Sequence, residues 1–313
     1  MSSSPSTEQG GRQSPSADFP AYMKAQAEII DRRLDEFLPP PEQPPAVIHE
    51  AMRYAMFAGG KRLRPVLAVT VAEALQGPMH QVLPLACGLE MIHCFSLIHD
   101  DLPAMDDDDF RRGKPTLHRC YDEAVAILAG DALLNLALQV VSETPCQDAR
   151  QVRRVLEVLG RLCRATGSVG GMIAGQVEDM SSQGQEFDAD RLHLIHSAKT
   201  GALITAAVEC SALLCGASQE DLRRLGAYGR HIGLAFQVVD DILDVEGSRQ
   251  QLGKSAGKDQ AAAKATFPSL YGVEESRRMA EELVEKAVAE VSFLGDRARM
   301  LCELARFISV RRF

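Results

Sequence analysis

Two aspartate clusters, each placed on an apolar helical run, constrain this chain more than any other feature. The first cluster begins at the end of such a run and places six aspartates within the ten residues 100–109. Negative charges this close together repel one another, so the cluster is costly unless a positive group binds it. We therefore expect the folded chain to hold a cation at this position.

The second cluster lies in the segment 236–244, which reads Phe-Gln-Val-Val-Asp-Asp-Ile-Leu-Asp. At about 100° per residue, Asp240, Asp241 and Asp244 fall within roughly 100° of one helix face. Their neighbours are apolar, so this face should point inward, where unpaired carboxylates are expensive. A single acidic run is usually a solvated surface, but two clusters of this kind beside cationic residues favour a functional interpretation.

The ligand chemistry of the clusters points to magnesium and phosphate. Carboxylate oxygens suit Mg²⁺, which typically bridges carboxylates to substrate phosphates. Arg111 and Arg112 follow the first cluster and would bind the remaining phosphate charge. In an unbroken helix Asp106 would lie about 240° from Asp100, and Pro103 disfavours continuation. We predict that the helix breaks and that Asp106 returns along a loop.

The fold class follows from apolar periodicity. The chain has 313 residues, 46% of them hydrophobic, which is enough for one large core or two ordinary domains. Helical patterns recur along most of its length and alternating strand patterns are nearly absent, so we predict an all-α fold. Residues 1–17 lack apolar periodicity and are predicted to be a disordered tail, with a single domain over residues 18–313.

Charge and composition exclude several classes of partner. The net charge is −9 and no basic face stands out, which argues against nucleic acid. No apolar run approaches the roughly 18 residues of a membrane span, and the N-terminus is not a signal peptide, so we expect no stable membrane anchor. The eight cysteines show no Cys-x-x-Cys spacing, which indicates reduced core cysteines in a cytoplasmic protein.

Glycine and basic residues between two predicted helices suggest a second anion site. Gly59 and Gly60 allow the backbone to approach a ligand closely, and Lys61 and Arg64 could share one helix face. An ordinary helix end followed by a basic first turn is the alternative interpretation.

Two further predicted helices carry candidate residues. Residues 84–101 read as one buried helix on which His93 lies about 20° from Asp100, although an isolated histidine is often a core residue. A second helix, over residues 188–215, contains Lys199, Thr200 and Gly201 near its middle. Glycine there costs about 1 kcal/mol relative to alanine, so we expect a kink or a ligand approach.

Together these motifs resemble the trans-prenyltransferase (polyprenyl diphosphate synthase) family, nearest to the bacterial farnesyl diphosphate synthase type. The resemblance runs from about residue 59 to residue 313. It is carried by Gly-Gly-Lys-Arg-Leu-Arg-Pro (59–65), Asp-Asp-Leu-Pro-Ala-Met-Asp (100–106), Arg-Arg-Gly (111–113), Lys-Thr-Gly (199–201), the second aspartate segment (236–244) and Lys-Ala-Thr-Phe-Pro (264–268).

The resemblance implies a fold and a cofactor. The expected fold is a single-domain bundle of about ten or more helices around a deep central cavity, the isoprenoid synthase fold, in a homodimer. About three Mg²⁺ ions, or Mn²⁺ in their place, would bind the diphosphate of an allylic substrate. Their expected ligands are Asp100, Asp106, Asp240 and Asp244, with Asp101 and Asp241 supporting them.

The resemblance also implies how the substrates are held. Arg111, Lys199 and Lys254 would contact the allylic diphosphate. Lys61, Arg64, His93 and Arg112 would hold isopentenyl diphosphate, and Arg311 would close over it. Thr200 and Gln237 would face the allylic cation, and Lys258 and Lys264 are further substrate-binding candidates. The resemblance also implies that Phe95 forms the floor that limits the product to 15 carbons, the neighbouring Ser96 being too small to do so. An ordinary core phenylalanine is the alternative, because Phe95 lies about 140° around the helix from Asp100.

The function implied is the Mg²⁺-dependent head-to-tail condensation of isopentenyl diphosphate with dimethylallyl and geranyl diphosphate to give farnesyl diphosphate. A geranylgeranyl or geranyl diphosphate synthase of the same family remains an alternative. A terpene cyclase would normally lack the second aspartate motif and the 59–65 segment. A non-catalytic synthase subunit usually loses one aspartate motif or its arginines, and both are intact here.

Overall fold

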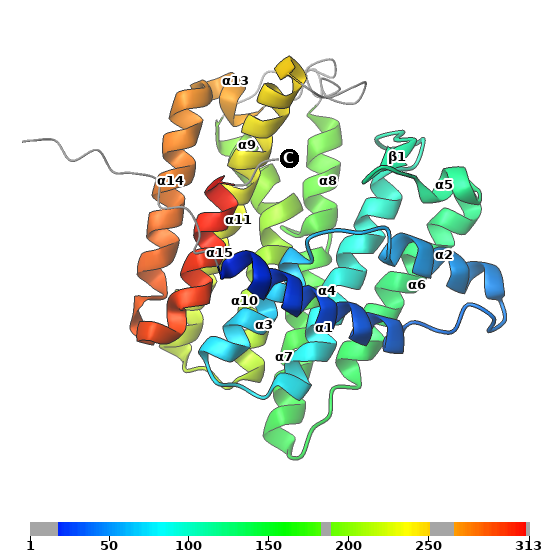
Figure 1. The fold of residues 1–313 in the computed structure, drawn as a ribbon, viewed down its shortest axis with the longest axis horizontal. Helices are drawn as coiled ribbons and strands as arrows, with labels where there is room; N and C mark the ends of the chain where they lie inside the picture. The colour runs from blue at the N-terminus through cyan, green and yellow to red at the C-terminus, as the bar shows by residue number, and fades with distance from the viewer. Residues whose placement is uncertain (1–17, 183–188, 251–265, 311–313) are drawn as a thin grey trace, which may run out of the picture.

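The computed structural model describes residues 18–182, 189–250 and 266–310, without the side chains of 247–250. Within these ranges the regular elements are helices apart from one short hairpin, so the all-α prediction is confirmed (Figure 1). The predicted disordered tail (1–17) and the candidates Lys254, Lys258, Lys264 and Arg311 lie outside the described residues.

Helical segments account for most of the described residues. In chain order they are α1 (Phe19–Phe37), α2 (Ala46–Met56), α3 (Leu63–Ala74), α4 (Met79–Asp100), α5 (Leu117–Cys120), α6 (Glu123–Ser142), α7 (Ala149–Thr166), α8 (Met172–Ser181), α9 (Ala189–His196), the π-helix η1 (Ser197–Gly201), α10 (Ala202–Leu214), α11 (Gln219–Gln250), α13 (Phe267–Tyr271), α14 (Val273–Glu290), the 3₁₀-helix η2 (Ser292–Ala298) and α15 (Arg299–Val310).

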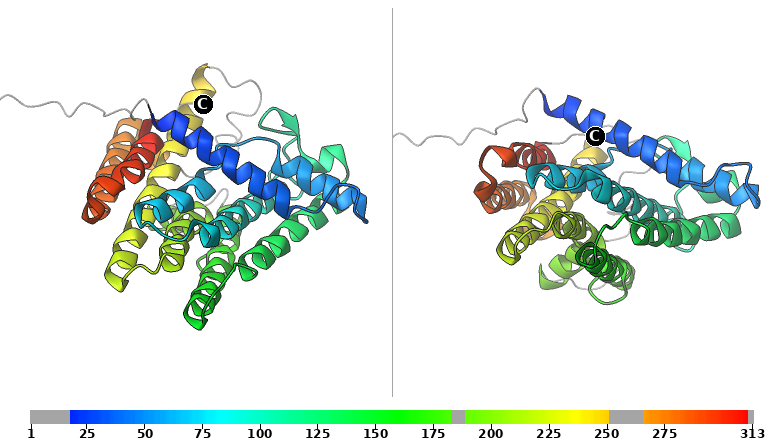
Figure 2. Two further views of the ribbon diagram at one scale, coloured as in Figure 1. Left: turned by 60° about the horizontal axis from the view of Figure 1, so that its bottom comes forward. Right: turned by 90° about the horizontal axis from the view of Figure 1, so that it is seen from below.

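The two helices that carry the aspartates both belong to the core. Helix α4 packs against α3, α6 and α10, whereas α11 packs against α10, α14 and α15. In the right-hand view of Figure 2 the cyan α4 runs between the blue α1 and the green α6. Helix α10 therefore connects the two halves of the bundle and brings η1, at its N-terminal end, between them.

Helix α4 begins earlier than predicted. Its first residue is Met79, five residues before Pro84, where the sequence had suggested the start. Proline lacks an N–H group and removes one helical hydrogen bond. Pro84 is buried together with Val82 and Leu85, and this packing is the tertiary contribution that overrides the local preference.

Two helices contradict the expectation that no apolar run reaches the length of a membrane span. By length and composition alone, Met79–Asp100 and Glu123–Ser142 could each cross a membrane. Their apolar windows are 72% and 39% buried inside the protein, respectively. The first is explained as a core helix, while the second, α6, keeps an exposed apolar face with Ile127 and Leu128 on it.

A small hairpin follows the first aspartate cluster. Strand β1 (Phe110–Arg111) pairs antiparallel with β2 (Lys114–Pro115). Arg112 and Gly113 form its two-residue turn, and both have positive φ, at 54° and 76°. This conformation fits the primed turns that connect tight hairpins. The hairpin places both arginines of the motif beside the end of α4, and the sequence analysis did not predict it.

Candidate active site

The first aspartate cluster folds back on the end of α4. Helix α4 ends at Asp100, and the backbone N–H of Asp106 donates to the Asp100 carbonyl oxygen at 2.8 Å. The N–H of Asp108 likewise donates to the carbonyl oxygen of Asp101 at 3.2 Å. The predicted break and return of Asp106 are therefore confirmed.

Asp100 occupies an environment that disfavours its charge. Burial is the main cause that raises its pKa to about 6, and the nearby charges of Asp106 and Asp101 act in the same direction. Lys199 and Arg111 act in the opposite direction without cancelling the effect. A half-buried carboxylate whose charge is incompletely compensated is a suitable ligand for a cation.

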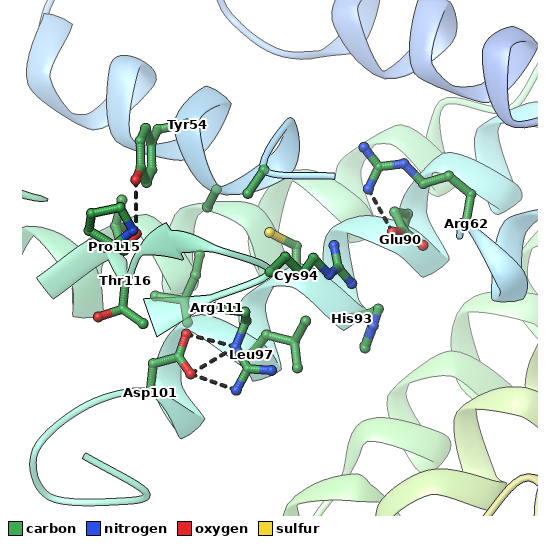
Figure 3. Close-up of a pocket in the computed structure, with 15 residues that line it drawn as sticks. Tyr54, Arg62, Glu90, His93, Cys94, Leu97, Asp101, Arg111, Pro115 and Thr116 are labelled. Carbon is green, nitrogen blue, oxygen red and sulfur yellow. Dashed lines mark hydrogen bonds and ion pairs between the residues drawn. The ribbon is translucent and has the colours of Figure 1, made fainter. Parts of the chain in front are cut away.

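Asp101 binds Arg111 rather than facing the same way as Asp100. The Arg111 Nε donates to both Asp101 carboxylate oxygens at 2.8 and 2.9 Å, and Nη2 donates to Oδ1 at 2.6 Å (Figure 3). Asp101 is only 4% exposed. This fork orients Arg111 towards the cluster, and the paired charges raise the pKa of the guanidinium despite its burial.

Asp241, the middle aspartate of the second cluster, is equally buried, and its hydrogen-bond donors are a side-chain amide and a backbone N–H. Its Oδ1 accepts from Gln237 Nε2 at 2.9 Å, and its Oδ2 accepts from the backbone N–H of Phe267 at 2.9 Å. His196 Nε2 lies 3.5 Å from Oδ2, and the His196 ring stacks on Phe267. Asp240 is half-buried and Asp244 exposed on the same helix.

The Lys-Thr-Gly motif lies in the π-helix η1, so the predicted irregularity is present. Lys199 Nζ donates to Asp179 Oδ2 of α8 at 2.6 Å, and Thr200 Oγ1 donates to Gln237 Oε1 of α11 at 2.9 Å. A π-turn inside a helix frequently marks a functional site. Thr200 and Gln237 are thus brought together by a hydrogen bond, and their expected position beside an allylic cation stays a prediction.

Two glycines allow neighbouring helices to approach η1. A Cβ at Gly175 of α8 would collide with the backbone at Lys199, and one at Gly233 of α11 would lie 3.0 Å from the Cα of Gly201. Gly175 therefore marks a close contact between α8 and η1.

The 59–65 segment approaches the hairpin arginines. Gly59 and Gly60 have φ of 102° and 129°, and Arg112 Nη1 donates to the Gly59 carbonyl oxygen. A Cβ at Gly60 would collide with the guanidinium of Arg112. Lys61 lies over the Phe307 ring of α15 with Nζ 5.7 Å from its centroid, so the C-terminal helix borders this site.

His93 lies among these cations. It lines a cavity of about 40 Å³ together with Arg111 and Arg112 (Figure 3). Burial, followed by the charges of Arg64 and Arg112, lowers the pKa of His93 well below its usual value. A neutral imidazole is therefore expected until an anion offsets the surrounding positive charge.

Arg62 is a structural residue that the sequence analysis did not single out. Its Nε donates to Asp31, Nη1 to Glu90 and Nη2 to the carbonyl oxygen of Met56, all at 2.7–2.8 Å. Arg62 and Glu90 are 4% and 3% exposed. These bonds fix the segment that carries Lys61 and Arg64 onto α4, three residues from His93. Asp179, His196 and Phe267 were likewise missed, since only the fold reveals their partners.

The chain-length candidates lie one turn before the aspartates. Phe95 is buried on α4, and its ring meets His99 edge-on with centroids 4.9 Å apart. His99 Nε2 lies 3.1 Å from the Ile127 carbonyl oxygen of α6, so Phe95 lies at the α4–α6 contact. Ser96 donates to the carbonyl oxygen of His93 at 2.9 Å.

The donor set fits a divalent cation that is shared with a substrate. Within residues 18–182, 189–250 and 266–310, no group of three or more potential ligands is already assembled around one point. Mg²⁺ commonly takes one or two carboxylates and completes its shell with water and phosphate oxygens. Asp100 with Asp106 on one side, and Asp240 with Asp244 on the other, fit that mode of binding.

The chain is similar to proteins of one known family. The polyprenyl synthetase family matches residues 45–296. The chain is 45% identical to "Heterodimeric geranylgeranyl pyrophosphate synthase large subunit 1, chloroplastic" of Arabidopsis thaliana, over 95% of this chain and 80% of that protein. It is 45% identical to "Geranylgeranyl diphosphate synthase" of Cyanophora paradoxa, over 92% and 94%. A crystal structure of an "FPP/GFPP synthase" from Zymomonas mobilis superposes with a TM-score of 0.84, at 39% identity over 94% of this chain and 99% of that one.

Proposed function

Because the chain belongs to the polyprenyl synthetase family and is a prenyltransferase, we propose that it condenses isopentenyl diphosphate with allylic diphosphates to give geranylgeranyl diphosphate. The observation that carries the proposal is the position of η1, which packs against α11 and carries a cation close to the end of α4. The charge of Lys199 partly offsets the rise in the pKa of Asp100 that burial causes at the end of α4, while Thr200 donates to Gln237 on α11. One short segment thus contributes to the surroundings of both clusters.

The first step would be ionisation of the allylic substrate. The C1–O bond breaks and its electron pair leaves with the diphosphate, whose charge Lys199 and Arg111 stabilise. Mg²⁺, when bound by the aspartates, would neutralise further charge on the leaving group. Thr200 Oγ1 and Gln237 Oε1 offer lone pairs that stabilise the allylic cation electrostatically.

The second step would form the new bond. Lys61, Arg64 and Arg112 would bind the diphosphate of isopentenyl diphosphate, with His93 beside them. The double bond of that substrate then attacks C1 of the cation, and the proton lost from the adduct passes to a diphosphate oxygen. Water must be excluded throughout, because it would trap the cation.

A 20-carbon product is favoured by the relatives, which include proteins named geranylgeranyl diphosphate synthase at 44–46% identity. The test is to supply isopentenyl diphosphate with each of dimethylallyl, geranyl and farnesyl diphosphate and to separate the dephosphorylated products by chromatography. The proposal predicts a C20 product from all three. Failure to elongate farnesyl diphosphate contradicts it.

Farnesyl diphosphate is the second candidate product, and Phe95 is the observation that favours it. The aromatic ring is 7% exposed, close to the first aspartate cluster, and could block a chain growing beside α4. If the wild type stops at C15, the Phe95→Ala variant should extend the product to C20 or longer. Phe110→Ala, which changes an exposed phenylalanine in the hairpin, provides the control. An unchanged C15 profile in Phe95→Ala would remove this residue as the floor.

We also propose a homodimer through α6 and α7. Exposed apolar side chains gather on these adjacent helices, with Ile127 and Leu128 on α6 and Val152 and Leu156 on α7. Light scattering should report a dimer for the wild type and a monomer for Leu128→Lys/Leu156→Lys. A wild type that stays monomeric alone and associates only with a different chain would contradict the homodimer. It would instead resemble the Arabidopsis relative, which is named as the large subunit of a heterodimer.

A reducing compartment, such as the cytoplasm, is the proposed location. All eight cysteines are free, and Cys87, Cys94 and Cys210 are buried in the core. Imaging of the tagged full chain in its native cell would test the location, and a signal confined to an organelle would contradict it.

A further inference from the structure

A second cavity borders η1, and neither Lys199 nor Thr200 lines it. It has a volume of about 560 Å³ and is bounded by α7, η1, α10 and α11. Ser197 and Gly201, the first and last residues of η1, form part of its wall. None of the residues proposed above to bind metal or substrate lines it.

The cavity carries an excess of positive charge in a chain whose net charge is −9. Arg161 and Arg164 of α7 and Arg230 of α11 line it, with Glu209 as the one carboxylate among its lining residues. Arg161 donates to Glu209, and Arg230 lies 3.8 Å from the same carboxylate. Arg164 has no carboxylate within ion-pair distance in the part of the chain that the structure describes. The wall could therefore accept an anion.

The remaining surface of the cavity is largely apolar. Ala202 and Ala206 of α10 and Leu234 of α11 contribute to it, and Val169, which is 88% exposed, lies at its edge. Cavities of several hundred cubic ångströms with a few convergent polar groups are typical of small-molecule sites. The combination suits a ligand with a charged head and an apolar chain.

We propose that this cavity binds a prenyl diphosphate without a metal ion, as an effector site separate from the active site. The identity of the ligand rests on the proposed function, since the reaction supplies an anion with an isoprenoid chain. An occupant would press on Ser197 and Gly201, and these residues flank Lys199 and Thr200. A displacement of η1 would change the contacts of Lys199 with Asp179 and of Thr200 with Gln237.

The first experiment measures binding by calorimetry, using a non-reactive thio analogue of farnesyl diphosphate in the presence of EDTA. Removal of metal should suppress binding that depends on the aspartates, whereas the arginine site should persist. In Arg164→Glu/Arg230→Glu the metal-independent binding should weaken by at least about tenfold. Arg150→Glu/Arg153→Glu reverses two exposed charges on α7 outside the cavity and should leave the binding unchanged.

Three outcomes of this titration would overturn the proposal. The first is that the wild type and Arg164→Glu/Arg230→Glu bind the analogue equally tightly. The second is that both double variants lose the same amount of affinity. The third is that the wild type binds inorganic diphosphate as tightly as it binds the analogue. Both altered arginines are exposed, and circular dichroism verifies that the variants fold.

The second experiment measures turnover with both substrates saturating. The thio analogue should leave a residual inhibition of the wild type that saturating substrate does not relieve. Arg164→Glu/Arg230→Glu should lose this residual inhibition and keep its basal turnover. Purely competitive inhibition of the wild type, or the same residual inhibition in the variant, would overturn the effector role. Absence of any wild-type turnover would instead contradict the proposed function, while the metal-independent binding would still report on the cavity.

Discussion

The two aspartate motifs share a sequence pattern but differ in how they are built. In each, the first aspartate is half-buried and the second is 4% exposed. Asp101 holds a guanidinium through three contacts, whereas Asp241 holds an amide and a backbone N–H. The first motif therefore orients a cation, and the second orients the neutral Gln237 and the start of α13. Identical dipeptides can serve different purposes because their partners come from other parts of the fold.

The largest effect should come from the first aspartate of each motif. Asp100→Ala and Asp240→Ala should each lower kcat by at least about 10³-fold, on the scale of losing a main stabiliser of developing negative charge. If the motifs share the diphosphate equally, the two losses should be similar at saturating Mg²⁺. Asp296→Ala, at an exposed position in η2, is the control. Near-normal turnover in either variant would show that its motif does not act through metal.

The second aspartates of the two motifs should differ in how much they contribute to the stability of the fold. Asp101→Asn removes the charge that pairs with Arg111 and should reduce the free energy of unfolding by about 2 kcal/mol. Asp241→Asn should cost about 1 kcal/mol or less, because Gln237 can reverse its amide and Thr200 can accept instead of donate. Urea denaturation of the two variants measures the difference. Equal losses would mean that the charge of Asp101 adds nothing beyond its hydrogen bonds.

The cations beside the motifs should differ in which substrate they affect. Arg64→Ala should raise KM mainly for isopentenyl diphosphate, by about ten- to hundredfold for a lost charge-assisted contact. Lys199→Ala should instead weaken use of the allylic substrate. Steady-state kinetics with each substrate varied in turn distinguishes the two. A larger effect of Arg64→Ala on the allylic KM would reverse the assignment of the sites.

The smallest expected effect concerns His93, on the cationic side of the first motif. Its folded-state pKa lies well below the unfolded value of about 6.5. Below pH 6.5 the unfolded chain takes up a proton that the folded chain does not, so this contribution to stability is present above pH 6.5 and lost as the pH falls. The loss should approach about 1 kcal/mol per pH unit.

Urea denaturation at pH 7 and at pH 5.5 tests this linkage. His93→Gln should lose less stability between the two pH values than the wild type does. Equal losses would indicate that His93 titrates normally in the folded protein.

The sequence predicted those parts of the site that local geometry determines. Helix period and Pro103 were enough to place the return of Asp106, and Gly201 marked the irregular segment that proved to be η1. The pairing of Lys199 with Asp179 could not be predicted, because it depends on how α8 packs against η1. The same holds for Arg62, whose three partners come from α1, α2 and α4. The exposed apolar face of α6 was not predicted, because a helix with few charged residues looks the same in the sequence whether it is buried or exposed.

The π-turn η1 also determines how helix α9 is rotated about its axis relative to α10. A π-turn uses one residue more per hydrogen-bonded turn than an α-helix, so helix α9 is rotated by about 100° relative to an uninterrupted helix. That rotation governs where His196 points, and its ring stacks on Phe267 with centroids 5.4 Å apart. Deleting a single residue from η1 would restore the α-helical period and turn His196 away from Phe267. The number of residues between α9 and α10 is therefore constrained, whatever the identity of their side chains.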